Sequence, residues 1–265
     1  MSTGSPSAVH EALREYFEAQ VGGDPLDVAR AKVEWRMSCF HSGLTYANYL
    51  EKHFFPLAGR TVLDPACAWG GHAVAFATRG AQVAAAEFID HEFAGLRRFC
   101  EGLRLEVRLC RSNCEQLPFT SGTFDVILAF ELIEHINSVD RFAGEVARLL
   151  CPGGICLIST PARVRSLIER EPHYGLKGLT WLPLRLQSWV ARKIFGRRYP
   201  YPIVRQYSRA SQIIGAFSAH GLVGQPVLSG RLSNRHAAES VVRQIVEEWL
   251  WNFVVIRRPN RLQAG

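Results

Sequence analysis

Short apolar runs alternate with longer amphipathic stretches through most of this chain. The runs contain Val, Ile, Leu and Ala without strict alternation, as expected for strands that are covered on both faces of a parallel sheet. We expect strands at 60–65, 82–87, 105–110, 124–130, 154–160, 222–228 and 251–256. Helical spacing between the runs predicts helices at 71–79, 90–102, 139–150, 208–220 and 236–248. This order predicts a doubly wound α/β sheet.

Two parts of the chain depart from this alternation. Before the first strand, apolar positions at helical spacing are interrupted by Gly-Gly-Asp-Pro at 22–25, so we expect one helix before this break and two more at 25–38 and 43–54. Between 162 and 206 the chain is rich in Trp, Tyr, Pro and Arg and contains no strong strand. The predicted organisation is a helical cap at 1–57, a core at 58–163, a basic, aromatic-rich insertion at 164–207 and a completion of the core at 208–265.

A cofactor site is predicted where the first strand ends. The sequence Thr61-Val-Leu-Asp-Pro-Ala-Cys-Ala-Trp-Gly-Gly71 contains an apolar strand ending in Asp64, a turn of small residues and the start of a helix. Small residues let the backbone approach a ligand closely, and the N–H groups at the helix start favour a carboxylate or phosphate. The second strand ends in Glu87, where an acid can accept hydrogen bonds from both hydroxyls of a ribose.

Three later blocks carry a resemblance to a known family. They are Ser112-Asn-Cys-Glu-Gln-Leu-Pro-Phe119, Phe124-Asp-Val-Ile-Leu-Ala-Phe-Glu-Leu-Ile-Glu-His135 and Arg148-Leu-Leu-Cys-Pro-Gly-Gly-Ile-Cys-Leu-Ile-Ser-Thr-Pro161. Together with the turn and Glu87, they resemble the class I S-adenosylmethionine (SAM) dependent methyltransferases, in the small-molecule branch with the motifs L-E-H and L-x-P-G-G. The resemblance covers about residues 58–163. It implies a Rossmann-like, seven-stranded, mostly parallel sheet with an antiparallel last strand, and SAM as the cofactor.

The resemblance also implies which residues surround SAM. Asp64 would reach the ammonium of the cofactor, Glu87 the ribose, and Asn113 the adenine amine. The cofactor-binding set expected from the resemblance is Asp64, Ala66, Ala68, Trp69, Gly70, Glu87, Phe88, Asn113, Cys114, Phe130 and Glu131. This chain departs from the family at Ala66 and Ala68, where glycine is usual. Because alanine resists a positive φ by about 1 kcal/mol, we expect SAM binding only if both alanines adopt ordinary dihedral angles.

Two histidines are candidate general bases for a hydroxyl acceptor, His135 after the fourth strand and His173 in the insertion. Glu131, Glu134 and His135 allow a second interpretation, because a small branch of the family, including RNA 2′-O-methyltransferases and some quinone O-methyltransferases, uses metal with a similar pattern. In a third interpretation, Glu134 and His135 open a helix and form local hydrogen bonds. Since most family members with L-E-H are thought to need no metal, we expect none.

The positive charge of the chain is concentrated in one segment. The net charge is +7, yet residues 172–238 contain no acidic residue. The basic residues of this segment are Lys177, Arg185, Arg192, Lys193, Arg197, Arg198, Arg205, Arg209, Arg231 and Arg235. Such a segment attracts a phosphorylated or carboxylated substrate, an anionic membrane or nucleic acid. A predicted helix at 183–195, with Leu186, Val190 and Ile194 on one face, suits a bilayer surface, a lid over an anionic substrate, or packing on the sheet.

Aromatic residues of the insertion form either a pocket for a flat or apolar acceptor or the insertion's own core. They are Trp181, Trp189, Tyr199, Tyr201 and Tyr207. The chain has seven cysteines with no C-x-x-C pair, no run of 18 apolar residues and no apolar segment at its start. These features predict reduced thiols and a cytoplasmic protein, with peripheral membrane contact through 183–198 as an open alternative.

We therefore expect an enzyme that transfers a methyl group from SAM to a small-molecule or lipid-linked, anionic acceptor, at oxygen. An RNA methyltransferase is one alternative, although the basic residues form one insertion rather than a separate RNA-binding module, and the signature N/D-P-P-Y/F is missing. A non-catalytic binding protein with a relic cofactor fold is another, because of the altered turn. An NAD(P) dehydrogenase is disfavoured because the turn lacks G-x-G-x-x-G.

Overall fold

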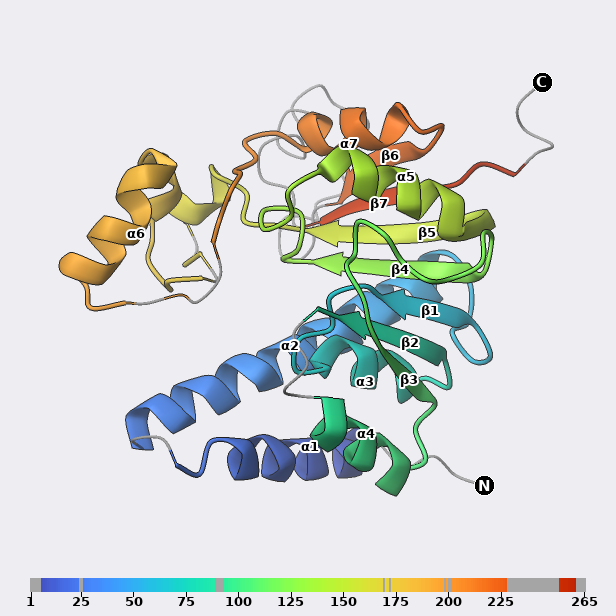
Figure 1. Ribbon diagram of the computed structural model, residues 1–265, viewed down its shortest axis with the longest axis horizontal. Coiled ribbons are helices and arrows are strands. Elements are labelled where there is room, and N and C mark those ends of the chain that lie inside the picture. Colours follow the sequence, from blue (N-terminus) through green and yellow to red (C-terminus); the bar gives the residue numbers. More distant parts are fainter. Residues whose placement is uncertain are drawn as a thin grey trace. The chain divides into compact units, whose positions relative to one another are not determined.

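A computed structural model describes residues 6–23, 26–88, 93–168, 170–171, 173–197, 199, 202–227 and 253–260. These residues contain a seven-stranded sheet with the order β3-β2-β1-β4-β5-β7-β6 (Figure 1). The last strand, β7, runs antiparallel to both β5 and β6. The predicted α/β fold with an antiparallel last strand is therefore confirmed.

The chain divides into two compact units, Met1–Ile127 and Leu128–Gly265. The first contains α1 (Pro6–Gln20), α2 (Leu26–His53), β1 (Thr61–Asp64), α3 (Gly71–Ala77), β2 (Gln82–Glu87), α4 (Phe93–Gly102), β3 (Val107–Arg111) and the start of β4 (Phe124–Phe130). In this unit β1 pairs in parallel with β2 and with β4, and β2 pairs in parallel with β3. Parallel pairing brings the carboxyl ends of β1 and β2, and so Asp64 and Glu87, to the same edge of the sheet.

The second unit contains the rest of the sheet and the insertion. Its elements are α5 (Val139–Leu149), β5 (Leu150–Ser159), two 3₁₀ turns η2 (Arg165–Leu167) and η3 (Leu179–Trp181), α6 (Leu184–Lys193), α7 (Ala210–Ser218), β6 (Val223–Val227) and β7 (Phe253–Arg257). The predicted helix at 236–248 lies outside the described residues. The predicted division into four segments stays a prediction.

The expected pair of helices at 25–38 and 43–54 is wrong, because α2 continues through Gly43. Close packing explains why the glycine does not end the helix. A Cβ at Gly43 would lie 2.7 Å from the Cβ of Ala75 and 3.2 Å from the Cα of His72 in α3. Glycine is therefore needed there for the approach of α2 to α3, and this packing outweighs its low helix propensity.

Strand β5 begins at Leu150, four residues before its predicted start, although it contains Pro152 and two glycines. The N–H of Gly153 donates to the carbonyl of Arg258 (2.9 Å), and the N–H of Arg258 donates to Gly154 (3.0 Å). Residues after β7 thus supply partners for this segment. A contact between residues about a hundred positions apart is not visible in local sequence.

Candidate functional site

The turn after β1 has the tight geometry that its small residues predict. Gly70 has φ +80° and precedes α3, and its N–H donates to the carbonyl of Cys67 (2.7 Å). A Cβ at Gly70 would lie 2.5 Å from Leu96, and one at Gly71 would lie 3.0 Å from the backbone nitrogen of Phe40 in α2. Glycine is therefore required at both positions. Gly70 needs it for its positive φ, and at both positions a Cβ would be too close to neighbouring atoms.

Glu87 at the end of β2 holds this turn directly. One carboxylate oxygen accepts a hydrogen bond from the N–H of Ala68 (2.9 Å), and the other accepts from the N–H of Phe88 (2.7 Å). Each ionised carboxylate oxygen has two lone pairs, so Glu87 keeps capacity to accept further hydrogen bonds. The acid expected at a ribose therefore lies beside the expected cofactor turn.

The condition placed on the two alanines is met at only one of them. Ala68 has φ +44°, in the left-handed region, whereas Ala66 does not have a positive φ. The expectation of ordinary dihedral angles at both positions is therefore wrong for Ala68. Its hydrogen bond to Glu87 offsets the conformational cost of about 1 kcal/mol. The turn thus keeps the shape that glycine usually provides.

Replacing Ala68 with glycine should stabilise the protein. Glycine adopts a positive φ without steric cost, and this gain exceeds the entropy that glycine adds to the unfolded chain. We expect Ala68→Gly to raise the free energy of unfolding by about 0.5–1 kcal/mol in urea titrations. Ala66→Gly is the matched control and should lower it. A destabilised Ala68→Gly variant would show that the left-handed conformation carries no strain.

Asp64 is a buried acid with an incompletely satisfied carboxylate. It is 5% exposed, and its Oδ2 has no hydrogen-bond partner among the described residues. Burial raises its pKa, a hydrogen bond from the Ala66 N–H opposes the shift, and the charge of Glu87 adds to it, so that the pKa is about 7. A buried oxygen of this kind suits a cationic ligand group such as an ammonium.

Arg36 and Trp69 form a second contact at the turn. The guanidinium carbon of Arg36, on α2, lies 3.2 Å from the centroid of the Trp69 ring. Arg36 is 4% exposed, so this cation–π contact is desolvated. It fixes the orientation of Trp69 against the N-terminal helices. No sequence pattern pointed to Arg36, because it lies 33 positions before Trp69 in an ordinary helical pattern.

The remaining predicted contacts of the first unit lie after β2 and β3. Phe88 is 65% exposed directly after Glu87. The side-chain carbonyl of Asn113 accepts from the N–H of Glu115 (2.9 Å), which uses one of its two lone pairs. Burial raises the pKa of the Cys114 thiol to about 12, so this cysteine is neutral and is not a nucleophile.

In the second unit, a cluster of acids and histidines follows β4. Glu131 has φ +48°, and one of its carboxylate oxygens accepts from the hydroxyl of Ser159 (2.9 Å). Burial and the nearby charge of Glu134 raise the pKa of Glu131 to about 8. A non-glycine residue held at positive φ is strained, and such strain is typical of functional sites. The interpretation that Glu134 and His135 open a helix is wrong, because α5 begins at Val139 with the Ser138 hydroxyl as its cap.

His173, from the insertion, joins this cluster. Its Nε2 lies 3.1 Å from Nε2 of His135 and 3.4 Å from a carboxylate oxygen of Glu134, and its Nδ1 lies 3.2 Å from Glu171. Burial lowers its pKa, but the close carboxylates of Glu134 and Glu171 and the charge of Glu131 outweigh burial and raise the pKa to about 9. In this arrangement His173 is protonated at neutral pH.

His135 has the opposite protonation state. Burial lowers its pKa, more than the charge of Glu134 raises it, so the ring is neutral at pH 7. Its Nδ1 lies 2.8 Å from the carbonyl of Pro202. Because a carbonyl only accepts, Nδ1 carries the hydrogen, and Nε2 presents its lone pair toward His173 and the hydroxyl of Tyr199 (3.4 Å).

Three groups of this cluster could act together as metal ligands. One donor atom each from Glu134, His135 and His173 lies within 4.8 Å of the other two. Glu134 is 1% exposed, and among the described residues neither of its carboxylate oxygens accepts a well-aligned hydrogen bond. Carboxylate and imidazole donors that converge in this way fit a divalent cation.

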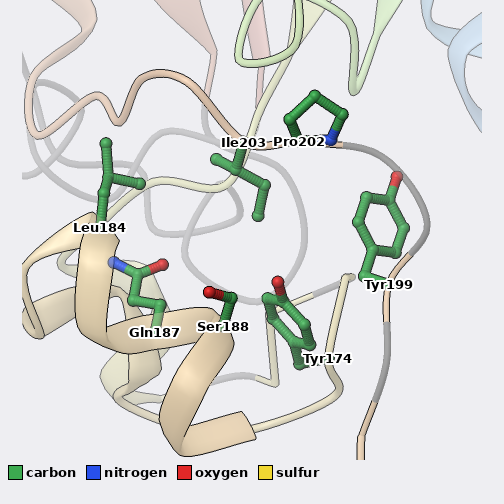
Figure 2. Close-up of a pocket in the computed structure, with 7 residues that line it drawn as sticks. All are labelled: Tyr174, Leu184, Gln187, Ser188, Tyr199, Pro202 and Ile203. Atoms are coloured by element: carbon green, nitrogen blue, oxygen red, sulfur yellow. The ribbon is translucent and has the colours of Figure 1, made fainter. Parts of the chain in front are cut away.

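A pocket of about 380 Å³ lies next to the cluster. Figure 2 shows that Leu184, Gln187 and Ser188 line one side of it from α6, and that Tyr174, Tyr199, Pro202 and Ile203 line the rest. The Tyr199 ring also packs edge-on against His173, with centroids 4.5 Å apart, so one side chain contacts both the pocket and the cluster. Trp181 and Trp189, two expected pocket residues, are about half exposed and do not line it, and Tyr201 lies outside the described residues.

Two features of the first unit are typical of a nucleotide-cofactor domain of the α/β class. These are a parallel sheet with acids at the ends of β1 and β2, and a glycine-containing turn between β1 and a helix. Comparisons with known proteins make this specific. Residues 63–158 match the family model described as methyltransferase domain. The chain therefore contains, at residues 63–158, a segment that matches the methyltransferase domain family.

Relatives and solved structures agree with this family. A ubiquinone biosynthesis O-methyltransferase of Methylocella silvestris is 28% identical over 175 residues, which cover 66% of each chain. A protein of the same name from Psychrobacter arcticus is 29% identical over 203 residues, 69% of this chain and 79% of that one. The structure of a SAM-dependent methyltransferase from Mesorhizobium loti has a TM-score of 0.53 at 15% identity and covers 80% of this chain and 96% of that one. The chain thus spans just under two thirds of the Methylocella relative, and the solved structure supports the fold.

Proposed function

We propose that this protein transfers a methyl group from SAM to an oxygen atom of a small-molecule acceptor. The observation that carries the proposal is the pair of acids at the turn after β1. Asp64 offers a buried carboxylate oxygen that has no hydrogen-bond partner among the described residues, and Glu87 accepts hydrogen bonds at the turn itself. These groups suit the ammonium and the ribose of SAM. The names of the Methylocella and Psychrobacter relatives, both O-methyltransferases, support oxygen as the acceptor atom.

In such a transfer, the acceptor oxygen attacks the methyl carbon as the carbon–sulfur bond breaks, and sulfur keeps the electron pair. The hydroxyl of the acceptor must also lose its proton. Pocket residues near Tyr199 would hold the acceptor beside the histidine cluster, so that its hydroxyl lies near His135. Holding both reactants in one geometry is the larger part of the rate gain for this type of reaction.

We further propose that Glu134, His135 and His173 hold a divalent cation, which departs from the expectation of no metal. Binding of the cation would release the proton that His173 carries in the metal-free cluster. The convergence of these donors and the absence of a well-aligned hydrogen bond at Glu134, among the described residues, support this assignment. A bound divalent cation lowers the pKa of a hydroxyl that coordinates it. If no cation is used, the Nε2 lone pair of His135 is the group placed to take the proton, which is the second interpretation of the cluster.

The acceptor that we propose is lipid-linked and is met at a membrane surface through residues 183–198. A pocket of 380 Å³ accommodates a ring-sized group, and α6 forms one of its walls. The biosynthetic role in the names of both relatives also favours a small molecule over RNA. Among the described residues, no helix is both long and apolar enough to cross a membrane.

A transfer assay tests the function and the cation together. The purified protein is incubated with methyl-labelled SAM and a panel of phenols, quinols, sugars and lipid-linked intermediates. We expect label in an O-methylated product, loss of that activity with a chelator, and recovery with Mg²⁺, Mn²⁺ or Zn²⁺, while the affinity for SAM is unchanged. Activity that resists chelation would assign the proton transfer to His135 alone, and transfer to RNA only would contradict the proposed acceptor class.

The affinity for SAM should depend on pH through Asp64. The pKa of Asp64 is raised to about 7, so it is mostly protonated at pH 6 and ionised at pH 8. Only the ionised form attracts an ammonium, and we therefore expect about tenfold weaker SAM binding at pH 6 than at pH 8. Asp64→Asn should bind weakly at both values. The sign follows from the raised pKa. The buried carboxyl of the free protein stays protonated up to about pH 7, so the folded state loses stability as the pH rises from 3.8 to about 7, and the ammonium of the cofactor offsets this cost once Asp64 is ionised.

A further inference from the structure

The outer face of α6 exposes large apolar side chains. Leu186 is 47% and Trp189 51% exposed, and just beyond the helix Ile194 is 62% and Phe195 55% exposed. The inner face carries Gln187 and Ala191, which are buried. Unlike an ordinary surface helix, α6 therefore directs part of its apolar surface to solvent and buries a glutamine.

Basic side chains border this apolar face. At the helical spacing of α6, Leu186, Trp189 and Lys193 share one stripe, and Arg185 and Arg192 lie along its edge. All three basic residues are exposed, and the helix contains no acidic residue. Of the predicted apolar face, only Val190 turns inward, where it packs on the cluster of Tyr174, Leu179 and Ala191.

The charge around α6 has one sign over a long stretch of sequence. No Asp or Glu occurs between residues 172 and 238, so no acidic group of this stretch neutralises the arginines. Two basic residues of the stretch are used inside the fold, since Arg205 donates to the carbonyls of Ile136 and Asn137, and Arg209 precedes α7 as its cap. Arg185, Arg192 and Lys193 have no such role in the described residues.

We propose that the outer face of α6, formed by Leu186, Trp189 and Lys193 with Arg185 and Arg192, docks on an anionic phospholipid bilayer. Tryptophan and leucine enter the interface between headgroups and acyl chains, and the basic residues attract the anionic headgroups. An apolar face bordered by basic residues is complementary to the surface of an anionic bilayer.

Docking would also place the pocket at the bilayer. Leu184, Gln187 and Ser188 line the pocket from the same two-turn stretch of α6 that carries Leu186 and Trp189 outward. One helix thus separates the bilayer from the pocket, and a lipid-linked acceptor needs to leave the membrane by about the width of a helix, roughly 10 Å. The docking deepens the membrane contact of the proposed function, and its link to catalysis rests on that function.

Vesicle flotation with the full chain tests the docking surface. We expect binding to vesicles of phosphatidylglycerol and phosphatidylcholine, weaker binding to phosphatidylcholine alone, and weakening with salt. The double variant Leu186→Ser/Trp189→Ser should bind about tenfold more weakly or worse. Arg185→Gln/Arg192→Gln should lose most of the salt dependence. Trp35→Ser, at an exposed tryptophan of α2, is the matched control and should bind like the unmodified protein.

Because flotation measures no methyl transfer, its result is independent of the proposed methyl transfer. Circular dichroism and thermal unfolding, measured on each variant, confirm that it is folded. Failure of the unmodified protein to bind anionic vesicles at millimolar lipid would overturn the proposal, and so would a Leu186→Ser/Trp189→Ser variant that binds normally. Tight RNA binding that requires Arg185 and Arg192 would also overturn it, by reassigning the surface to nucleic acid.

Discussion

Replacing His135 with alanine is expected to lower kcat by about 10²–10⁴-fold and to leave the affinity for SAM unchanged. His135 is the one histidine of the described cluster that is neutral at pH 7, and its lone pair is at Nε2, facing His173 and Tyr199, because Nδ1 donates to the carbonyl of Pro202. That lone pair is needed whether it holds a cation or accepts a proton. The effect should therefore fall on the chemical step, measured by single-turnover methyl transfer.

Controls separate this effect from loss of structure. His53→Ala replaces an exposed histidine of α2 and should retain full activity. Calorimetric titration with SAM shows whether the cofactor half of the His135→Ala protein is intact. Activity within a few-fold of the unmodified enzyme would remove His135 from the reaction and leave the cluster with a structural role.

Replacing Glu87 with alanine is expected to weaken SAM binding by about 1–3 kcal/mol, or roughly 5–150-fold in Kd. Two ribose hydroxyls would lose their acceptor, and the N–H of Ala68 would lose the hydrogen bond that holds the turn at positive φ. Glu87→Gln keeps one oxygen acceptor at nearly the same position and should give an intermediate loss.

A matched surface variant completes this test. Glu101→Ala removes an exposed acid from α4, in the same unit, and should bind SAM normally. Titration of the Glu87→Ala/Ala68→Gly double variant with SAM then separates the ribose contact of Glu87 from its support of the turn. Glycine adopts a positive φ without the hydrogen bond to Glu87, so the loss that remains belongs to the ribose contact. Unchanged SAM affinity in Glu87→Ala would remove this residue from the cofactor site.

The groups proposed to bind the cofactor, in the first unit, were largely predictable from the sequence because they follow from strand ends. Asp64 and Glu87 each close an apolar run, and parallel pairing of β1 with β2 brings them together. The conformation of Ala68 was not predictable, because steric preference alone argues against it. Its positive φ depends on a hydrogen bond to Glu87, 19 positions later.

The cluster of acids and histidines in the second unit was predictable only in part. The spacing of Glu131, Glu134 and His135 is local and visible in sequence, whereas the approach of His173 brings together residues 38 positions apart across the insertion. Glu171, which orients His173 and lies two residues before it, could have been suspected from that proximity. The outward direction of the apolar residues of α6 depends on what covers its other face, which no local pattern records.

The most direct test of the central claim is a crystal structure of the protein with S-adenosylhomocysteine, the product of methyl transfer from SAM. We predict that the ribose hydroxyls will lie within hydrogen-bonding distance of Glu87 and the ammonium group near Asp64. A turn after β1 that stays closed, with the protein's own side chains in the place of the nucleoside, would contradict the account.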